Sequence, residues 1–171
     1  MKNDTQAPYR VVDVCRYIVH YTYDTQPISV SYLQLLKLLY FVQAYFLITT
    51  GNPCFKEKII AHSYGPYIEE VHQEYGMYGG MMIWPRKTYL EKTPSASWGI
   101  KEVEYKEDTI AKKDRERIAE VVNRFSGYCN SDMAKIIWNQ RPWKAAYNKE
   151  NNNWKREITN QSLLEYFADD N

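Results

Sequence analysis

Residues that could perform nucleophilic or metal chemistry are few in this sequence and widely separated. The 171-residue chain contains three histidines and three cysteines: His20, His62, His72, Cys15, Cys54 and Cys129. No two histidines are three or four residues apart, and no two cysteines form a Cys-x-x-Cys pair, the spacings typical of zinc sites and redox motifs. We therefore expect no metal site. A catalytic Cys54–His62 pair brought together by the fold remains an alternative, and His20 is interpreted as a structural residue.

Glycines that could cradle a phosphate lack the usual context. Gly76, Gly79 and Gly80 are not followed by Lys-Ser or Lys-Thr, and no strand pattern precedes them, so they do not form a P-loop. No Gly-x-Ser-x-Gly sequence is present, which argues against the nucleophile elbow of α/β-hydrolases. Residue types and spacing thus predict that the protein is not an enzyme and takes no cofactor.

Composition restricts the class of partner. Lys and Arg total 22 and Asp and Glu total 21, a net charge of +1, whereas a protein that binds nucleic acid mainly by electrostatics needs a basic surplus. DNA is therefore not an expected partner. The odd number of cysteines favours a reducing compartment. No apolar stretch follows Lys2, so we predict no secretory leader, no membrane partner and a cytoplasmic location.

Tyrosine is abundant, with 16 residues beside five Trp and five Phe. A tyrosine ring buries apolar area while its hydroxyl keeps a hydrogen bond, which suits half-exposed positions and protein interfaces. We interpret most of these rings as core residues and the remainder as a contact surface for another macromolecule.

A leucine-rich helix forms the strongest secondary-structure pattern. Ser29 or Ser31 caps it, Ser31 with Gln34 has the spacing of a capping box, and Gly51 ends it. Apolar residues occur on several sides between Leu33 and Leu47. We therefore expect this helix to pack against several neighbours and to form the centre of the domain.

Further helices are predicted around it by apolar periodicity and capping residues. They run from Pro8 to Tyr23 or Asp24, from Pro66 to Gly76, from Asp108 or Thr109 to Ser126 or Gly127, from a cap at residues 130–132 through Ile137, from Pro142 to Tyr147, and from a Thr159 cap through Phe167. The charged outer face at residues 112–117 is interpreted as solvated.

The segments between these helices are predicted to be extended or irregular. Residues 54–63 are expected to be extended, Met81–Tyr105 (including Trp98) to form short strands or a long loop, and Asn148–Asn153 to form a polar loop. The predicted fold class is mainly α. It is a single-domain helical bundle over residues 1–171, built around the central apolar helix, with a small extended or β insert.

Three motifs occur in order along the chain. Lys37-Leu38-Leu39-Tyr40-Phe41 lies in the central helix, Tyr64-Gly65-Pro66 follows an extended segment, and Pro142-Trp143 comes later. In identity, order and approximate spacing they resemble the Panacea domain, a phage-associated family that includes the SocA-like antitoxins, over residues 11–167. The sequence departs from the family pattern at Tyr67, where valine usually follows Gly-Pro, and at residues 137–139, where a Thr-His pair is expected.

The resemblance implies a helical antitoxin of a type II toxin–antitoxin system, encoded in a bacterial or prophage genome. Such a protein neutralises a cognate toxin by direct binding, and some relatives act as adaptors that deliver the toxin to a protease. We assign partner binding to Lys37, Tyr40, Tyr64 and Trp143. Lys37 either extends to the surface or meets an acidic group in a groove that Tyr40 shapes. Trp143 is either a core anchor or an exposed hot spot.

Two other functions remain as alternatives. One is a phage or mobile-element protein that uses the same surface to bind a host protein. The other is a DNA-binding regulator of its own operon, against which the mixed charges at residues 112–117 and the lack of a helix-turn-helix pattern argue.

Overall fold

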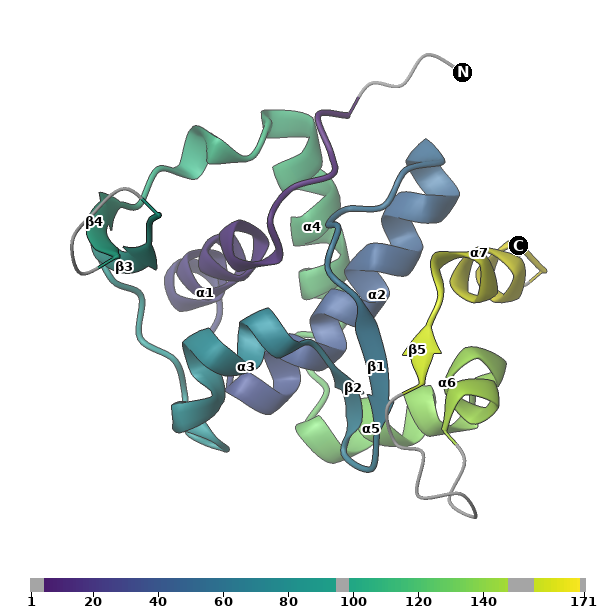
Figure 1. Ribbon diagram of the computed structural model, residues 1–171. Coiled ribbons are helices and arrows are strands. Elements are labelled where there is room, and N and C mark those ends of the chain that lie inside the picture. The colour runs from purple at the N-terminus through teal and green to yellow at the C-terminus, as the bar shows by residue number, and fades with distance from the viewer. Residues whose placement is uncertain (1–4, 95–98, 148–155, 170–171) are drawn as a thin grey trace.

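Seven α-helices and five short strands make up the part of the chain described by the computed structural model, residues 5–94, 99–147 and 156–169 (Figure 1). The elements are α1 (Val11–Thr25), α2 (Tyr32–Thr50), β1 (Ile59–His62), β2 (Gly65–Tyr67), α3 (Glu69–Tyr75), β3 (Thr88–Lys92), β4 (Ile100–Glu104), α4 (Lys112–Arg124), α5 (Asn130–Asn139), α6 (Arg141–Ala146), β5 (Glu157–Ile158) and α7 (Asn160–Asp169). The chain is thus mainly α-helical with a small β component, as predicted. Trp98 and the predicted loop at 148–153 lie outside the described residues.

The central position of α2 is confirmed. Ser31 caps the helix through a complete capping box with Gln34, and Gly51 ends it in the left-handed conformation at φ 74°, which glycine adopts without a steric cost. Leu35 and Leu39 are fully buried. Helices α1, α4, α5 and α7 and strand β2 all contact α2, so it runs through the middle of the molecule (Figure 1).

Helix α2 is also apolar and long enough to cross a membrane, and it is the one helix of the described ranges with that property. Most of its side chains are buried against the surrounding helices. Burial of this kind is typical of the core helix of a soluble protein, because the apolar surface is already covered by protein.

A three-stranded antiparallel sheet with the order β2-β1-β5 lies beside α2. His62 pairs with Gly65 across the turn Ser63–Tyr64, and Ala61 pairs with Pro66. The expectation that Pro66 begins a helix is therefore wrong. Its position on the edge strand β2 suits a residue without a backbone N–H, and α3 begins only at Glu69.

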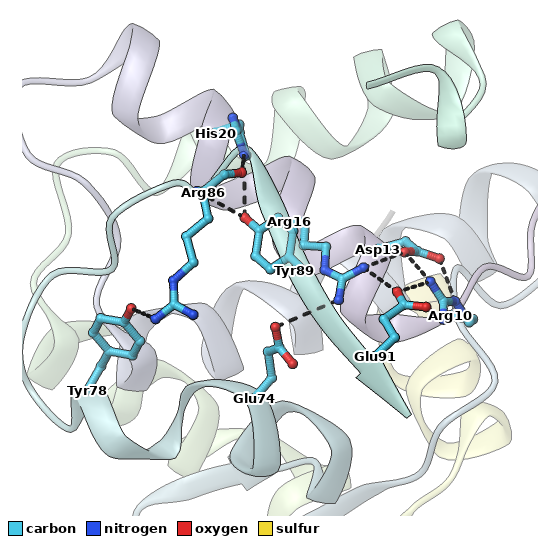
Figure 2. A network of polar contacts seen from close by, with 9 residues as sticks. All are labelled: Arg10, Asp13, Arg16, His20, Glu74, Tyr78, Arg86, Tyr89 and Glu91. Carbon is cyan, nitrogen blue, oxygen red and sulfur yellow. Dashed lines mark hydrogen bonds and ion pairs between the residues drawn. The ribbon is translucent and has the colours of Figure 1, made fainter. Parts of the chain in front are cut away.

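The insert at residues 81–105 forms an antiparallel pair of strands, β3 and β4, and a buried arginine on α1 holds it in place (Figure 2). Arg16 is 5% exposed, and its Nη1 lies 2.6 Å from Oε1 of Glu91 on β3. Its Nη2 lies 3.7 Å from Glu74 on α3, and its guanidinium carbon is 4.2 Å from the centre of the Tyr89 ring. One side chain thus connects α1, α3 and β3.

His20 belongs to the same region and is structural, as expected. Its Nε2 lies 3.1 Å from the carbonyl oxygen of Arg86, and its ring stacks on Tyr105 at 3.7 Å between centroids (Figure 2 shows the Arg86 contact). Burial lowers the pKa of His20, because the protein interior disfavours its charged form.

The segment before α1 is extended rather than helical. The backbone N–H of Tyr9 donates to the carbonyl oxygen of Cys54 at 2.7 Å, so Pro8 precedes the helix and does not begin it. The hydroxyl of Tyr9 donates to Asp114 on α4 at 2.6 Å, as does that of Thr5 at 2.7 Å. Asp114 is fully buried, so the expectation of a solvated face at 112–117 is wrong at this position.

Two further helix starts differ from the sequence expectation, and two agree with it. Residues 107–109 form a short 3-10 helix, so α4 begins later, and Cys129 rather than Asn130 occupies the cap position of α5. Pro142 lies in the first turn of α6, and the Thr159 hydroxyl accepts a hydrogen bond from the Ser162 backbone at 3.1 Å. Short polar residues compete for cap positions, which makes helix starts harder to predict than helix cores.

Candidate functional site

A cavity of about 760 Å³ lies between the first two turns of α2, the β1–β2 hairpin and the start of α3. Its apolar lining includes Leu33, Leu36 and Ile60. It also contains five aromatic side chains: Tyr32, His62, Tyr64, Tyr67 and His72. A concave, mostly apolar and aromatic surface with few polar groups is typical of a binding site.

Lys37 lines this cavity and is buried beneath it. The residue is 2% exposed, so its side chain does not extend to the surface. Its ammonium donates a hydrogen bond to the carbonyl oxygen of Leu33, one turn earlier, at 3.1 Å. No carboxylate of the described residues lies within ion-pair distance of it. Burial lowers the pKa of Lys37 from 10.5 to about 8, because the cation has lost most of its hydration.

Gly65 forms the wall of the cavity next to Lys37. A Cβ atom at this position would lie 3.6 Å from Cε and 3.8 Å from Nζ of Lys37, and the glycine has φ 113°. That conformation is costly for any residue with a side chain. The middle residue of the Tyr64-Gly65-Pro66 motif therefore lies next to the lysine of the α2 motif, with space between them for little more than a Cβ atom.

The aromatic side chains form a continuous series of ring contacts around the cavity. His62 stacks on Tyr64 at 5.3 Å between centroids and contacts Tyr67 at 5.9 Å. His72 contacts Tyr67 at 5.5 Å and Tyr32 at 5.9 Å. Tyr64, at one end of the series, is 70% exposed. These contacts join β1, β2, α3 and α2 into a single aromatic wall.

Three polar contacts hold this wall in position. The Tyr67 hydroxyl donates to Oε2 of Glu69 at 2.6 Å, and Gln73 donates to Oε1 of the same carboxylate at 3.0 Å. The Tyr32 hydroxyl oxygen lies 2.9 Å from Nδ1 of His72. Burial raises the pKa of Tyr32 to about 12, so this phenol is neutral at physiological pH. Both hydroxyls thus fix ring orientation.

The structure brings together two of the four residues that the sequence assigned to partner binding. Lys37 and Tyr64 line the same cavity. Tyr40 does not: it is fully buried, and its hydroxyl donates to Oε1 of Gln140 at 2.7 Å. Trp143 is also absent from the lining; it stacks on Tyr147 at 4.4 Å and packs against the core as an anchor of α6.

Sequence reasoning missed the rest of the aromatic wall. Tyr32 and Leu36 are four residues apart, as are Leu33 and Lys37, a spacing that places them on one helix face. That pattern was available in the sequence. The contribution of Tyr67 and His72 to the wall could not be predicted from spacing, because their positions depend on where β2 ends and α3 begins.

Comparison with known proteins assigns the chain to a family. The family model described as antitoxin SocA-like, Panacea domain, matches residues 35–144, more than half of the chain. The matched range includes Lys37, Tyr64, Gly65 and Trp143. Searches of curated proteins and of solved structures gave no significant match. The chain therefore belongs to the SocA-like antitoxin family that carries the Panacea domain.

Proposed function

We propose that this protein is an antitoxin that binds a cognate protein toxin directly and neutralises it, with the Lys37 cavity and its rim as the contact surface. One observation carries the proposal. Two motifs on which the family resemblance rests, the lysine of α2 and the Tyr64-Gly65-Pro66 segment, are separated in sequence and yet lie next to each other in the wall of this cavity.

The chemistry of the rim supports a protein partner. Tyr64 is 70% exposed beside an apolar, aromatic-walled cavity, and tyrosine is among the residues enriched at energetically important interface positions. An exposed ring next to a concave apolar surface can bury additional area when a partner side chain enters.

Specificity for one toxin is assigned to the two positions that depart from the family pattern. Tyr67 lies on the cavity wall, where its ring contacts His62 and His72. Trp138 is 37% exposed and contacts Trp143 at 6.3 Å between centroids. We propose that these rings select the partner, within a type II system in the cytoplasm, and that neutralisation by direct binding precedes any delivery to a protease.

Co-expression tests this function. The protein encoded by the neighbouring gene is induced alone and together with the antitoxin, and growth is followed. Growth arrest by the neighbour alone and rescue by co-expression are expected. If the neighbour does not inhibit growth, or is not neutralised, the antitoxin proposal fails. Capture of a host protein through the same surface would then favour the host-interaction alternative.

Two exposed residues supply a matched pair of variants. Tyr64→Ala removes the ring at the cavity rim, whereas Leu90→Ala removes an equally exposed side chain, 69% accessible, on β3. Loss of a hot-spot ring weakens binding by about tenfold or more. We expect Tyr64→Ala to lose rescue and Leu90→Ala to retain it. The reverse pattern would place the contact surface on the β3–β4 insert.

A further inference from the structure

The charge of Lys37 is not balanced within the described part of the protein. The residue is 2% exposed, and among the described residues its ammonium makes a single hydrogen bond, to the neutral carbonyl oxygen of Leu33. A lysine ammonium has three donors, so two remain for a group that enters the cavity. A buried cation without a counter-charge is costly. A buried ammonium at the base of a cavity therefore favours an anionic ligand that enters the cavity from solvent.

The walls of the cavity indicate what carries that anion. The cavity volume of about 760 Å³ lies in the range of small-molecule sites. Its aromatic wall includes the rings of Tyr32, Tyr64, Tyr67 and His62. Planar rings pack favourably in offset or edge-to-face geometry against such a surface. A flat, apolar body bearing the negative charge therefore fits both the walls and the base.

The cavity favours a ligand with a single negative charge. Glu69 also lines the cavity, and its two oxygens already accept hydrogen bonds from Tyr67 and Gln73. A second negative charge in the cavity would be repelled by this carboxylate. One ammonium with two remaining donors matches a carboxylate, whereas a phosphate dianion would require more cationic donors than Lys37 offers.

We propose that this cavity is a binding site for a small carboxylic acid carried on a planar ring. The carboxylate accepts hydrogen bonds from Nζ of Lys37, and the ring lies against the tyrosine and histidine side chains of the wall. This site shares its walls with the proposed toxin-contact surface, but the binding of a small acid can be tested on the purified protein alone, whether or not the cavity also contacts a toxin.

Calorimetric titration of the full chain provides the test. The probes are 4-hydroxyphenylacetate, indole-3-acetate and 2-naphthylacetate, each paired with its own amide, which has the same shape and no charge. At least one acid is expected to bind with a Kd of about 1 mM or tighter and about tenfold more tightly than its amide. The proposal is overturned if none of the three acids saturates, or if acid and amide bind equally.

Two variants distinguish the contribution of the Lys37 charge to ligand binding from that of the aromatic wall. Lys37→Met keeps a similar apolar stem but removes the charge, so the preference for acid over amide should disappear. Tyr64→Ala should weaken acid and amide by the same factor, because it removes ring contact only. Thermal melting first establishes that each variant is folded. Retention of the acid preference in Lys37→Met, or tighter binding of inorganic phosphate than of the acids, would contradict the proposal.

Proton uptake gives a second readout that does not depend on a variant. The titratable groups around Lys37 come from every element that forms the cavity: Tyr32, His62, Tyr64, Tyr67, Glu69 and His72. The pKa of Lys37 is about 8, so an anion that binds its charged form raises that pKa. Calorimetric titration of the protein with each ligand, somewhat above pH 8 and in two buffers of different ionisation enthalpy, measures this proton uptake. We expect uptake with the acid and none with the amide. Equal uptake with both ligands would count against Lys37 as the binding group.

Discussion

Lys37 and Gly65 lie next to each other in the wall of one cavity, although they belong to different elements of the fold. A Cβ atom on residue 65 would lie 3.6 Å from Cε and 3.8 Å from Nζ of Lys37. Their proximity brings the central helix and the β1–β2 hairpin together around a buried cation beside the cavity. This single relationship explains why a lysine in an apolar helix and a glycine in a short strand both contribute to one site.

Removal of the Lys37 charge should stabilise the protein. The pKa of Lys37 is about 8 in the folded protein and 10.5 in the unfolded chain. Below about pH 8 the lysine is charged in both states, so folding there bears the full free-energy cost of burying the charge. The interval between these values corresponds to about 3 kcal/mol. We expect Lys37→Met to unfold at higher urea concentration near neutral pH, with an advantage that shrinks as pH rises from about 8 to about 10.5. A less stable variant would mean that an unseen group balances the charge.

Substitution of Gly65 should destabilise the fold through its backbone. At φ 113° a side chain is strained, while a Cβ atom would meet Lys37 at ordinary contact distance. Gly65→Ala should therefore cost about 1–3 kcal/mol in the free energy of unfolding. Gly80→Ala is the control, because nothing lies within 4 Å of a Cβ there. Equal effects of the two substitutions would argue against the strained conformation at residue 65.

Tyr40 should matter for stability and not for partner binding. Its hydroxyl is buried and donates to Gln140 at 2.7 Å, so Tyr40→Phe leaves a buried acceptor unsatisfied at a cost of about 1–3 kcal/mol. The chemical denaturation midpoint should fall, and affinity for the toxin should be unchanged in the folded variant. A Tyr40→Phe variant with wild-type stability and weakened affinity would return Tyr40 to the binding surface.

Acid should weaken the attachment of β3 to α1. Hydrogen bonds from Arg10 and Arg16, the former the larger effect, hold the pKa of Glu91 at about 2, below its ordinary 4.5. A carboxylate with a depressed pKa contributes stability above about pH 4.5 that is lost as the pH falls toward about 2. The melting temperature of the wild type should thus exceed that of Glu91→Gln at neutral pH. The two curves should converge in that acidic window, and a constant difference would contradict the ion pair.

Local patterns predicted the central helix well, because the groups that define it are close in sequence. Ser31 and Gln34 cap it and Gly51 ends it, and each acts within one turn. The burial of the Lys37 side chain could not be predicted in this way. Whether its ammonium reaches water depends on the β1–β2 hairpin, which comes more than twenty residues later in the chain and closes over it.

The same limit explains the other differences. Tyr40 is three residues from Lys37, which turns it by about 60° around the helix and directs it to Gln140 rather than to the cavity. Asp114 lies in a run of charged residues, and contacts with the N-terminal segment bury it. Arg16 is a charged residue within an apolar stretch of α1, and its contact with β3 accounts for its burial. Residue spacing reports the face of a helix, whereas burial depends on the distant segment that covers that face.

Amide hydrogen exchange on the complex with the toxin tests the contact surface most directly. The protein is exchanged alone and with its neighbouring-gene toxin bound. We predict slower exchange in the toxin complex for peptides covering residues 62–67 and the first two turns of α2, with little change in β3 and β4. Protection confined to β3, β4 and α4, with the cavity segments unchanged, would contradict the assignment of the Lys37 cavity as the surface that the toxin contacts.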